Sequence, residues 1–320
     1  MTAAQLSTPW SLRAGLRLPI LNAPMGGVAG GRLAAAVTAA GGLGMIGMGS
    51  TATAASLATE LAALEQAPRF GIGLVDWVIR DRPDLLDAAL AARPALLSVS
   101  FGADLTWVDR AHAAGILAAT QVYDAETARR AQDAGLDVLV ARGAEGGGHG
   151  DTRLATLPLL DAVLDAVTVP VLAAGGIGSP RSLAAVLAAG AAGAWLGTCL
   201  SACPEALTAD SARRALIAAA GTDTVTTRVF DVGQRLDWPA RFPSRVLRNE
   251  FTGRWMGHEE TLAGDPEAAA ELAAGIAAGD QRVAPVDAGQ GVGVLTDSRP
   301  AGVVLDELCT GAQRLLARWS

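Results

Sequence analysis

Short apolar runs alternate with alanine-rich segments along the first two thirds of the chain. The runs have the length and composition of buried strands, whereas the segments between them place apolar residues at helical spacing. The strands that this pattern predicts are 18–25, 43–49, 70–77, 95–101, 116–123, 138–142, 169–174 and 194–199. The helices predicted after them lie near residues 31–40, 54–66, 83–92, 104–114, 125–134, 156–167, 180–189 and 205–220.

Local signals support several of these boundaries. Ser179 can cap a helix whose first position is Pro180, and Asp124 precedes the helical segment that starts at 125. Gly115 and Gly135 can end helices before the next strand. Eight strictly alternating strand and helix units are typical of a closed parallel barrel. The sequence therefore predicts an α/β fold, the TIM (β/α)8 barrel.

The strand and helix alternation stops near Gly221. The stretch to Pro300 contains scattered tryptophans and prolines, a predicted helix at 266–278 and a glycine-rich loop at 287–293. We interpret residues 1–221 as the barrel, 222–300 as an accessory, mostly helical subdomain inserted after the eighth strand, and 301–320 as a final helix that returns to the barrel. Residues 222–300 could form either a lid or a dimer surface, and a homo-oligomer is compatible with the sequence.

Composition narrows the class of protein. Hydrophobic residues make up 51% of the chain and charged residues 18%, which favours a globular protein with a large core. All 25 basic residues are arginine, so Schiff-base and P-loop lysine chemistry is excluded. The net charge is −7 and no dense arginine run occurs, so we expect no nucleic-acid partner.

Two uncharged runs, 33–59 and 182–204, exceed the ~20 residues of a membrane-spanning helix. Both are alanine-rich and interrupted by glycines, so each reads as a helix and a buried strand in series, and we expect no membrane association. Three cysteines offer no disulfide framework, and residues 1–19 lack a continuous apolar segment. A cytoplasmic location is expected.

Two glycine loops stand where TIM barrels commonly bind phosphate, after the seventh and eighth strands. Their residues are 174–178 and 196–198. Backbone N–H groups without side chains can close around a phosphate, and the helix that begins at Pro180 would add its positive end. Glycines at strand ends are also common turn residues, but two such loops in the expected order favour a phosphate site.

The loop after the sixth strand, 142–151, contains His149 between glycines. The flanking glycines predict little side-chain packing around this imidazole, which can accept or donate a proton at neutral pH. The barrel position favours a catalytic role over an exposed loop histidine. His112 and His258 read as structural, and too few ligands at suitable spacing remain for a metal site. The dinucleotide fingerprint at 42–47 lies within a predicted strand, which is the wrong context for nucleotide binding.

Several of these motifs together resemble the nitronate monooxygenase family, also called 2-nitropropane dioxygenase-like proteins. The residues that carry the resemblance are 21–25 (LNAPM), 120–122 (TQV), 146–150 with His149, 170–177 (PVLAAGGI) and 196–198 (LGT). The likeness covers most of 18–205 and continues weakly through 248–249 and 288–291. Flavin-dependent enoyl-acyl-carrier-protein reductases share the same pattern, so the motifs specify the cofactor better than the substrate.

The resemblance implies an FMN enzyme. It places the flavin phosphate on Gly175, Gly176, Gly197 and Thr198, the ring beside Pro24 and Met25, and Gln121 in contact with the flavin, with His149 as the catalytic base. The remaining residues of the implied flavin site are Ala23, Gly73, Arg142, Gly147, Gly148 and Ala174.

The implied reaction is oxidation of a nitronate or nitroalkane by dioxygen to a carbonyl compound and nitrite. His149 would remove a proton alpha to the nitro group or orient a nitronate that is already anionic. The alternative is reduction of an enoyl thioester by NAD(P)H. A third interpretation is a flavin-binding scaffold without activity, which the intact His149 disfavours.

Two positions depart from the family pattern. The family usually has asparagine in the third strand where this chain has Gly73, and often Gln-Gly after the sixth strand where this chain has Arg142-Gly143. The Arg142 guanidinium could neutralise flavin charge or hold a substrate carboxylate in a bidentate pair. A salt bridge to Glu145 or another barrel acid is an equal alternative.

Overall fold

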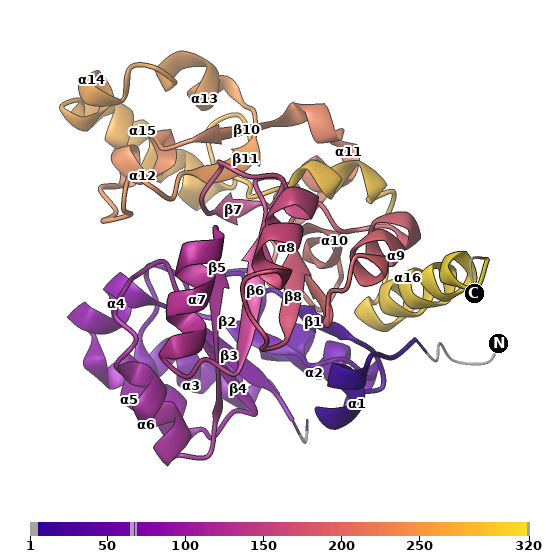
Figure 1. Cartoon of the computed structure of the whole chain (residues 1–320). Coiled ribbons are helices and arrows are strands. Elements are labelled where there is room, and N and C mark those ends of the chain that lie inside the picture. Colours follow the sequence, from indigo (N-terminus) through magenta and orange to yellow (C-terminus); the bar gives the residue numbers. More distant parts are fainter. Residues whose placement is uncertain (1–5, 65–66, 68, 319–320) are drawn as a thin grey trace.

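The computed structural model describes residues 6–64, 67 and 69–318. Its centre is an eight-stranded parallel sheet with the order β1-β9-β8-β6-β5-β4-β3-β2 (Figure 1). A parallel bridge between Leu21 and Leu43 joins the two ends of this sheet, so the strands close into a barrel. The predicted TIM barrel is confirmed.

Each strand predicted from the sequence occurs, usually shorter by a few residues at its ends. The barrel strands are β1 (Ile20–Asn22), β2 (Met45–Gly47), β3 (Gly71–Val75), β4 (Leu96–Ser100), β5 (Leu117–Val122), β6 (Val138–Arg142), β8 (Val171–Ala174) and β9 (Gly193–Leu196). The side chains of β3, β4 and β6 are buried throughout, because a parallel barrel strand faces the interior on one side and the helices on the other.

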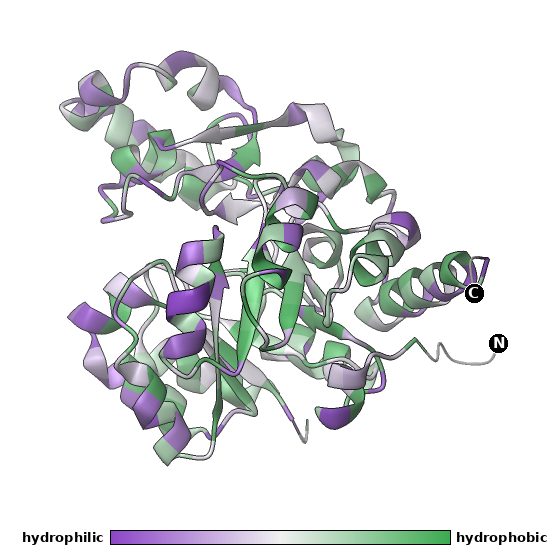
Figure 2. Ribbon diagram, viewed as in Figure 1, coloured by the Kyte–Doolittle hydropathy of each residue, from purple (hydrophilic) through white to green (hydrophobic). Residues whose placement is uncertain are grey.

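Helices surround the barrel as the alternation predicts. They are α2 (Gly31–Ala39), α3 (Ala54–Ala62), α5 (Pro83–Ala91), α6 (Trp107–Ala113), α7 (Ala125–Asp133), α8 (Thr156–Leu164), α9 (Pro180–Ala188) and α11 (Asp210–Ala218). Figure 2 shows apolar strands at the centre and polar outer faces on helices such as α7. Residues 65 and 66 of the helix predicted at 54–66 lie outside the described residues.

Capping chemistry explains where several helices begin. Ser179 Oγ accepts a hydrogen bond from the Ser182 backbone N–H, Ser182 Oγ accepts one from the Ser179 backbone N–H, and Pro180 occupies the first turn. Thr53 and Ser56 form the same reciprocal pair at α3. Gly190 has φ +104° after α9, a conformation that L side chains rarely adopt. These residues set the ends of the helices and hence the positions of the loops between them.

Among the described residues up to 221, three short α-helices have no counterpart in the predicted elements. They are α1 (Pro9–Arg13), α4 (Asp76–Asp81) and α10 (Thr198–Ser201). The helix α4 follows β3 without a connecting residue, and its first two residues, Asp76 and Trp77, lie within the strand predicted at 70–77. Helices of four to six residues carry too little periodicity to be separated from an apolar strand end.

A second sheet lies above the barrel in Figure 1, with the order β10-β11-β7. The strands β10 (Thr224–Thr227) and β11 (Ser244–Leu247) follow the barrel in sequence, whereas β7 (Gly148–His149) belongs to the loop after β6. The helices with this sheet are α12 (Val229–Gln234), α13 (Glu250–Trp255), α14 (Glu259–Ala263) and α15 (Pro266–Ala278), and α15 has the bounds predicted from the sequence. The barrel loop that contains His149 is therefore hydrogen-bonded to the segment after the barrel.

The last helix, α16 (Ala301–Leu316), packs against α9 and α2 of the barrel. Residues 319–320 of the predicted final helix lie outside the described residues. The boundaries at 221 and 300 stay a prediction. Among the helices that the structure describes, none is both long and apolar enough to cross a membrane.

Candidate active site

A cavity of about 510 Å³ opens at the carboxyl ends of the barrel strands. Its walls come from the barrel loops and from the segment that contains α12, β11 and the loop before the short helix η2 (Gln290–Val294). Every site residue predicted from the sequence lines this cavity: Ala23, Pro24, Met25, Gly73, Gln121, Arg142, Gly147, Gly148, His149, Ala174, Gly175, Gly176, Gly197 and Thr198. Residues more than 170 positions apart in the sequence thus share one cavity.

The two glycine loops after β8 and β9 present bare backbone to the cavity. Gly175 and Gly176 have φ of +111° and +67°, conformations that strain a side chain. A Cβ at Gly197 would meet nothing closer than the Met25 sulfur at 3.6 Å. These loops leave room for a group that contacts backbone N–H directly.

The glycine-rich loop predicted at 287–293 adjoins the same region. The Gly289 N–H donates to Thr198 Oγ1 at 2.9 Å, and the Gln290 N–H donates to the Glu145 carbonyl at 2.9 Å. A Cβ at Gly291 would lie 2.8 Å from the Gly176 carbonyl oxygen. The weak resemblance at 288–291 therefore corresponds to a segment in contact with the glycine loops of the barrel.

His149 is packed and hydrogen-bonded, contrary to the prediction from its flanking glycines. Its Nε2 lies 2.8 Å from Asp231 Oδ1, and its ring stacks on Trp238 with centroids 3.5 Å apart and planes 6° from parallel. Only 16% of its side chain is exposed. Both partners come from the segment after the barrel, 82 and 89 residues later in the chain, so local sequence could not reveal them.

Sequence reasoning missed Asp231 and Trp238, and also Ser244 and Asp287, all of which line the cavity. Ser244 Oγ donates to Asp287 Oδ1 at 2.9 Å, and Ser244 pairs with His149 across β11 and β7. The cluster of tryptophans and prolines after Gly221 was the available signal, but nothing in it indicated which side chains would reach His149.

Arg142 is buried beneath the loop that carries His149. Its Nη2 donates to the carbonyl oxygens of Gly146, Gly147 and Gly148 at 2.9, 3.0 and 2.9 Å. Side chains at Gly146 or Gly150 would collide with the guanidinium. The salt bridge to Glu145 that we weighed does not form, because Glu145 Oε2 accepts from Thr156 N and Oγ1 at 2.7 and 2.6 Å. Burial lowers the pKa of Arg142, but nearby Asp287 and Asp151 oppose this shift.

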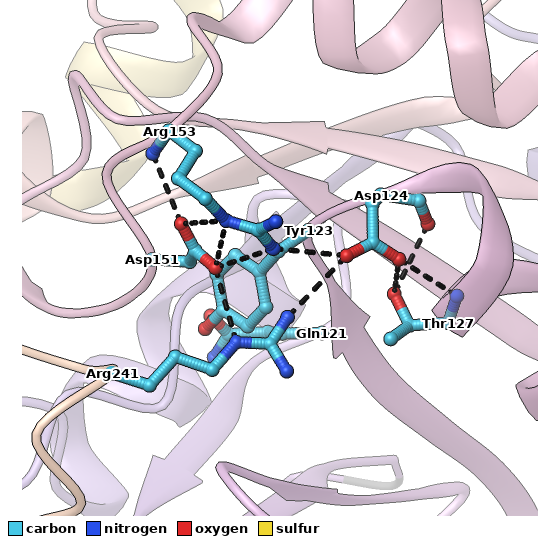
Figure 3. Close-up of polar contacts among 7 residues, drawn as sticks. All are labelled: Gln121, Tyr123, Asp124, Thr127, Asp151, Arg153 and Arg241. Carbon is cyan, nitrogen blue, oxygen red and sulfur yellow. Dashed lines mark hydrogen bonds and ion pairs between the residues drawn. The ribbon is translucent and has the colours of Figure 1, made fainter.

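An ionic network beside Gln121 ties the later segment to the barrel (Figure 3). Asp151 is 4% exposed and accepts from Arg153 Nε at 2.9 Å and from Arg241 Nε at 3.1 Å. Tyr123 Oη donates to Gln121 Oε1 at 3.1 Å. The arginines lower the pKa of Asp151 although burial raises it. Arg241 thus anchors the Trp238 loop to the barrel rim.

The three cysteines of the chain are free and buried. Burial raises the pKa of Cys199, Cys203 and Cys309 to about 12 each, so the reactive thiolate is disfavoured. Within the described ranges, no three His, Cys, Asp or Glu residues are arranged to hold a metal ion.

Comparison with known proteins agrees with this geometry. The nitronate monooxygenase family model matches residues 84–311. The chain belongs to the nitronate monooxygenase family. Members of this family are oxidoreductases that act on small molecules, and the recognition made from the sequence motifs is confirmed.

Solved structures extend the comparison over nearly the whole chain. Nitroalkane oxidase from Streptomyces ansochromogenes is 30% identical with a TM-score of 0.82, covering 97% of this chain and 100% of that one. FabK from Thermotoga maritima is 26% identical with a TM-score of 0.84, covering 98% of each chain.

A dehydrogenase of a hydroxy-methyl-oxo-octahydroindene-carboxyl-CoA from Rhodococcus jostii is 34% identical over 250 residues, which are 74% of this chain and 64% of that protein. The chain spans only 60% to 64% of the length of the first two curated relatives that it matches.

The family's usual asparagine in the third strand has no space in this chain. A Cβ at Gly73 would overlap the ring of Pro24. Both residues line the cavity. Pro24 can occupy its present position because residue 73 has no side chain, and an asparagine at 73 would require Pro24 to move.

We predict that Arg142→Gln lowers turnover of an alkyl nitronate and of a carboxylated nitronate by similar factors. The guanidinium supports three carbonyl oxygens of the His149 loop, so its loss should loosen that loop whatever the substrate carries. Steady-state rates of both substrates measure the effect. A much larger loss of turnover on the carboxylated nitronate would instead show that Arg142 binds a substrate carboxylate.

We predict that Asp287→Asn stabilises the protein at neutral pH and not in acid. Burial raises the pKa of Asp287 above its ordinary value of 3.8, so above that pH the unfolded carboxyl loses its proton more readily than the folded one. Folding then incurs a penalty that grows as pH rises and vanishes below the unfolded pKa. Melting temperatures of both proteins between about pH 4 and pH 8 test this, and a wild type at least as stable as the variant at pH 7 contradicts it.

Proposed function

We propose that this protein binds FMN and oxidises alkyl nitronates or nitroalkanes with dioxygen, giving a carbonyl compound and nitrite. The observation that carries the proposal is the placement of His149, with its carboxylate partner Asp231, in one cavity with the glycine loops after β8 and β9. Membership in the family and the likeness to the nitroalkane oxidase support the same reaction.

The residues present suit FMN. Gly175, Gly176 and Gly197 line the cavity with backbone that carries no side chain, and a Cβ at Gly197 would approach Met25 and Ala23, which line the same cavity. The helix α9 begins a few residues later, at Pro180. These glycines with Thr198 would hold the phosphate, and Pro24, Met25 and Gln121 would border the ring. Bound FMN would supply electron acceptance and the reaction with dioxygen, which no side chain of the chain can provide.

The chain itself would bind the substrate and handle its proton. His149 would take the proton from the carbon alpha to the nitro group, leaving the electron pair in the anionic nitronate. Trp238 covers one face of the imidazole, and Phe101 packs edge-on to Trp238 with centroids 5.0 Å apart. This aromatic wall would exclude water from the reacting atoms and accommodate an apolar substrate body.

The second candidate is reduction, or the reverse oxidation, of an acyl thioester with a nicotinamide partner. The likeness to FabK and to the carboxyl-CoA dehydrogenase favours it. The cavity and His149 would serve either reaction. The dinucleotide fingerprint at 42–47 gives no support, because Gly44 and Gly47 pack tightly against Ala34 and Pro24.

Steady-state assays of the purified protein with a preformed nitronate and with an enoyl thioester plus NADPH separate these functions. We expect nitrite release and dioxygen uptake with the nitronate and slow or absent turnover of the thioester. Fast thioester reduction without nitrite formation would instead establish the second candidate. The cytoplasmic location and the oligomeric state stay predictions.

A further inference from the structure

We propose that Asp231 is the positioning residue of His149: it keeps the imidazole proton on Nε2 and leaves Nδ1 as the atom that exchanges a proton with the substrate. This inference rests on the proposed base function of His149. It also gives the segment after the barrel a direct part in the reaction, because Asp231 lies in α12 and not in any barrel loop.

The hydrogen bond itself fixes the direction of the proton. Asp231 Oδ1 lies 2.8 Å from His149 Nε2, and an ionised carboxylate can only accept, so Nε2 must carry the hydrogen. A neutral imidazole with its proton on Nε2 has its lone pair on Nδ1. The carboxylate also stabilises the imidazolium that forms when Nδ1 takes a proton, as the acid of a hydrolase triad does.

Burial makes this contact more than an incidental ion pair. The Asp231 side chain is 5% exposed, and its second oxygen, Oδ2, is buried without a hydrogen-bond partner in the described structure. A buried carboxylate is costly unless it is paired, so His149 supplies the main compensation for its charge. Asp231 therefore depends on the imidazole as much as the imidazole depends on Asp231.

The ring of His149 is fixed in the other dimensions as well. Trp238 lies parallel to it at 3.5 Å, and the His149 backbone pairs with Ser244 in the second sheet. Tilting of the ring would break the stacking, and a half-turn flip, which keeps the stacking, would break the Asp231 hydrogen bond. The arrangement thus holds one orientation of the imidazole, which is what a base needs before substrate arrives.

Two other charged groups face this pair. Asp287, from the loop before η2, interacts electrostatically with both His149 and Asp231, and Ser244 donates to it. Arg142, from β6, is buried and also interacts electrostatically with Asp287. Among the described residues, neither group is hydrogen-bonded to the imidazole, so the Asp231 hydrogen bond is the contact that favours the proton on Nε2.

The chain contains a matched control in its other histidine–aspartate pair. His112 Nε2 lies 2.9 Å from Asp137 Oδ2, but these side chains are 41% and 32% exposed. Solvent can replace either partner there, and His112 lies on the outer helix α6. Asp137→Asn should therefore leave the reaction unchanged, whereas Asp231→Asn should not.

The first test is nitrogen-15 NMR of histidine-labelled, FMN-supplemented protein, which contains only three histidines. We expect His149, identified by loss of its signals in His149→Ala, to be protonated on Nε2 with a strongly deshielded proton shared with Asp231. Asp231→Asn should weaken that deshielding, and Asp137→Asn should leave it unaltered. A His149 protonated on Nδ1 alone, or a proton signal that Asp231→Asn does not move, would overturn the proposal.

The second test separates positioning from a merely structural role. Asp231→Asn should lower kcat on a neutral nitroalkane by about 100-fold or more, with preformed nitronate reduced only a few-fold, because no proton must be removed from it. Restoring the carboxylate with Asp231→Glu should recover part of the difference. Equal losses on both substrates with FMN retained would contradict positioning. A wild type inactive on both substrates would refute the proposed function while the NMR result still decides the role of Asp231.

Discussion

His149→Ala is expected to retain FMN and to lose turnover of neutral nitroalkanes by roughly 100-fold to 10,000-fold, the usual contribution of a general base. The imidazole lies in the cavity between Asp231 and Trp238, and its replacement leaves the glycine loops after β8 and β9 untouched. Flavin content should therefore stay close to that of the wild type. Absorbance of the bound flavin and steady-state rates on nitroethane measure the two quantities.

Comparing a neutral nitroalkane with a preformed nitronate provides the control for His149→Ala. Preformed nitronate has already lost the proton that His149 would remove, so its turnover should fall much less than that of the nitroalkane. His112→Ala, at an exposed helix position, should change neither rate. A His149→Ala protein that turns over nitroalkanes as fast as the wild type would show that the base lies elsewhere.

Gly176→Val should remove most of the bound flavin. The backbone of Gly176 has φ +67°, which a β-branched residue strongly disfavours, and its Cβ would stand 3.1 Å from the Glu145 Cβ. The strain and the contact with Glu145 would shift the loop backbone that is proposed to hold the phosphate. The purified variant should be colourless or pale, and its FMN dissociation constant should rise by at least about 100-fold, since direct backbone contacts to a charged phosphate are lost.

Gly253→Ala is the matched control for this variant. Gly253 lies in α13, and a Cβ there would meet nothing within 4 Å. It should retain full flavin content. A Gly176→Val protein that binds FMN as tightly as the wild type would mean that the phosphate site is not on the loop after β8.

The barrel was predictable because its signals are local and repeated. Each buried strand is a short apolar run, and capping residues such as Ser179 with Pro180 and end glycines such as Gly190 separate it from a helix. In a parallel barrel the carboxyl ends of all strands meet at one face. The strand order therefore also predicts that Pro24 and Gly176 share one cavity, which the structure confirms.

The environment of His149 was not predictable, for a physical reason. Its glycine neighbours provide no packing, and the sequence pattern therefore suggests an exposed loop. Packing and hydrogen bonding come from Trp238 and Asp231 instead, and antiparallel pairing with β11 fixes the loop. Contacts between side chains that are 80 to 90 residues apart leave no periodic trace in the sequence.

The buried role of Arg142 was missed for a related reason. From the sequence, an arginine at a strand end reads as a ligand receptor or a salt-bridge partner. In the structure its guanidinium donates to three carbonyl oxygens of the same glycine loop, whose missing side chains make the space for it. Gly146 and Gly150 thus serve the packing of Arg142 as well as any contact with a ligand.

The most direct test of the central claim is anaerobic mixing of the FMN-loaded protein with a nitronate and, separately, with NADH or NADPH. We predict that the nitronate changes the flavin absorbance within seconds, that admission of dioxygen restores it with release of nitrite, and that the nicotinamides leave it unchanged for minutes. Rapid bleaching by NADH or NADPH, together with no spectral response to any nitronate, would contradict the account and assign the site to thioester reduction.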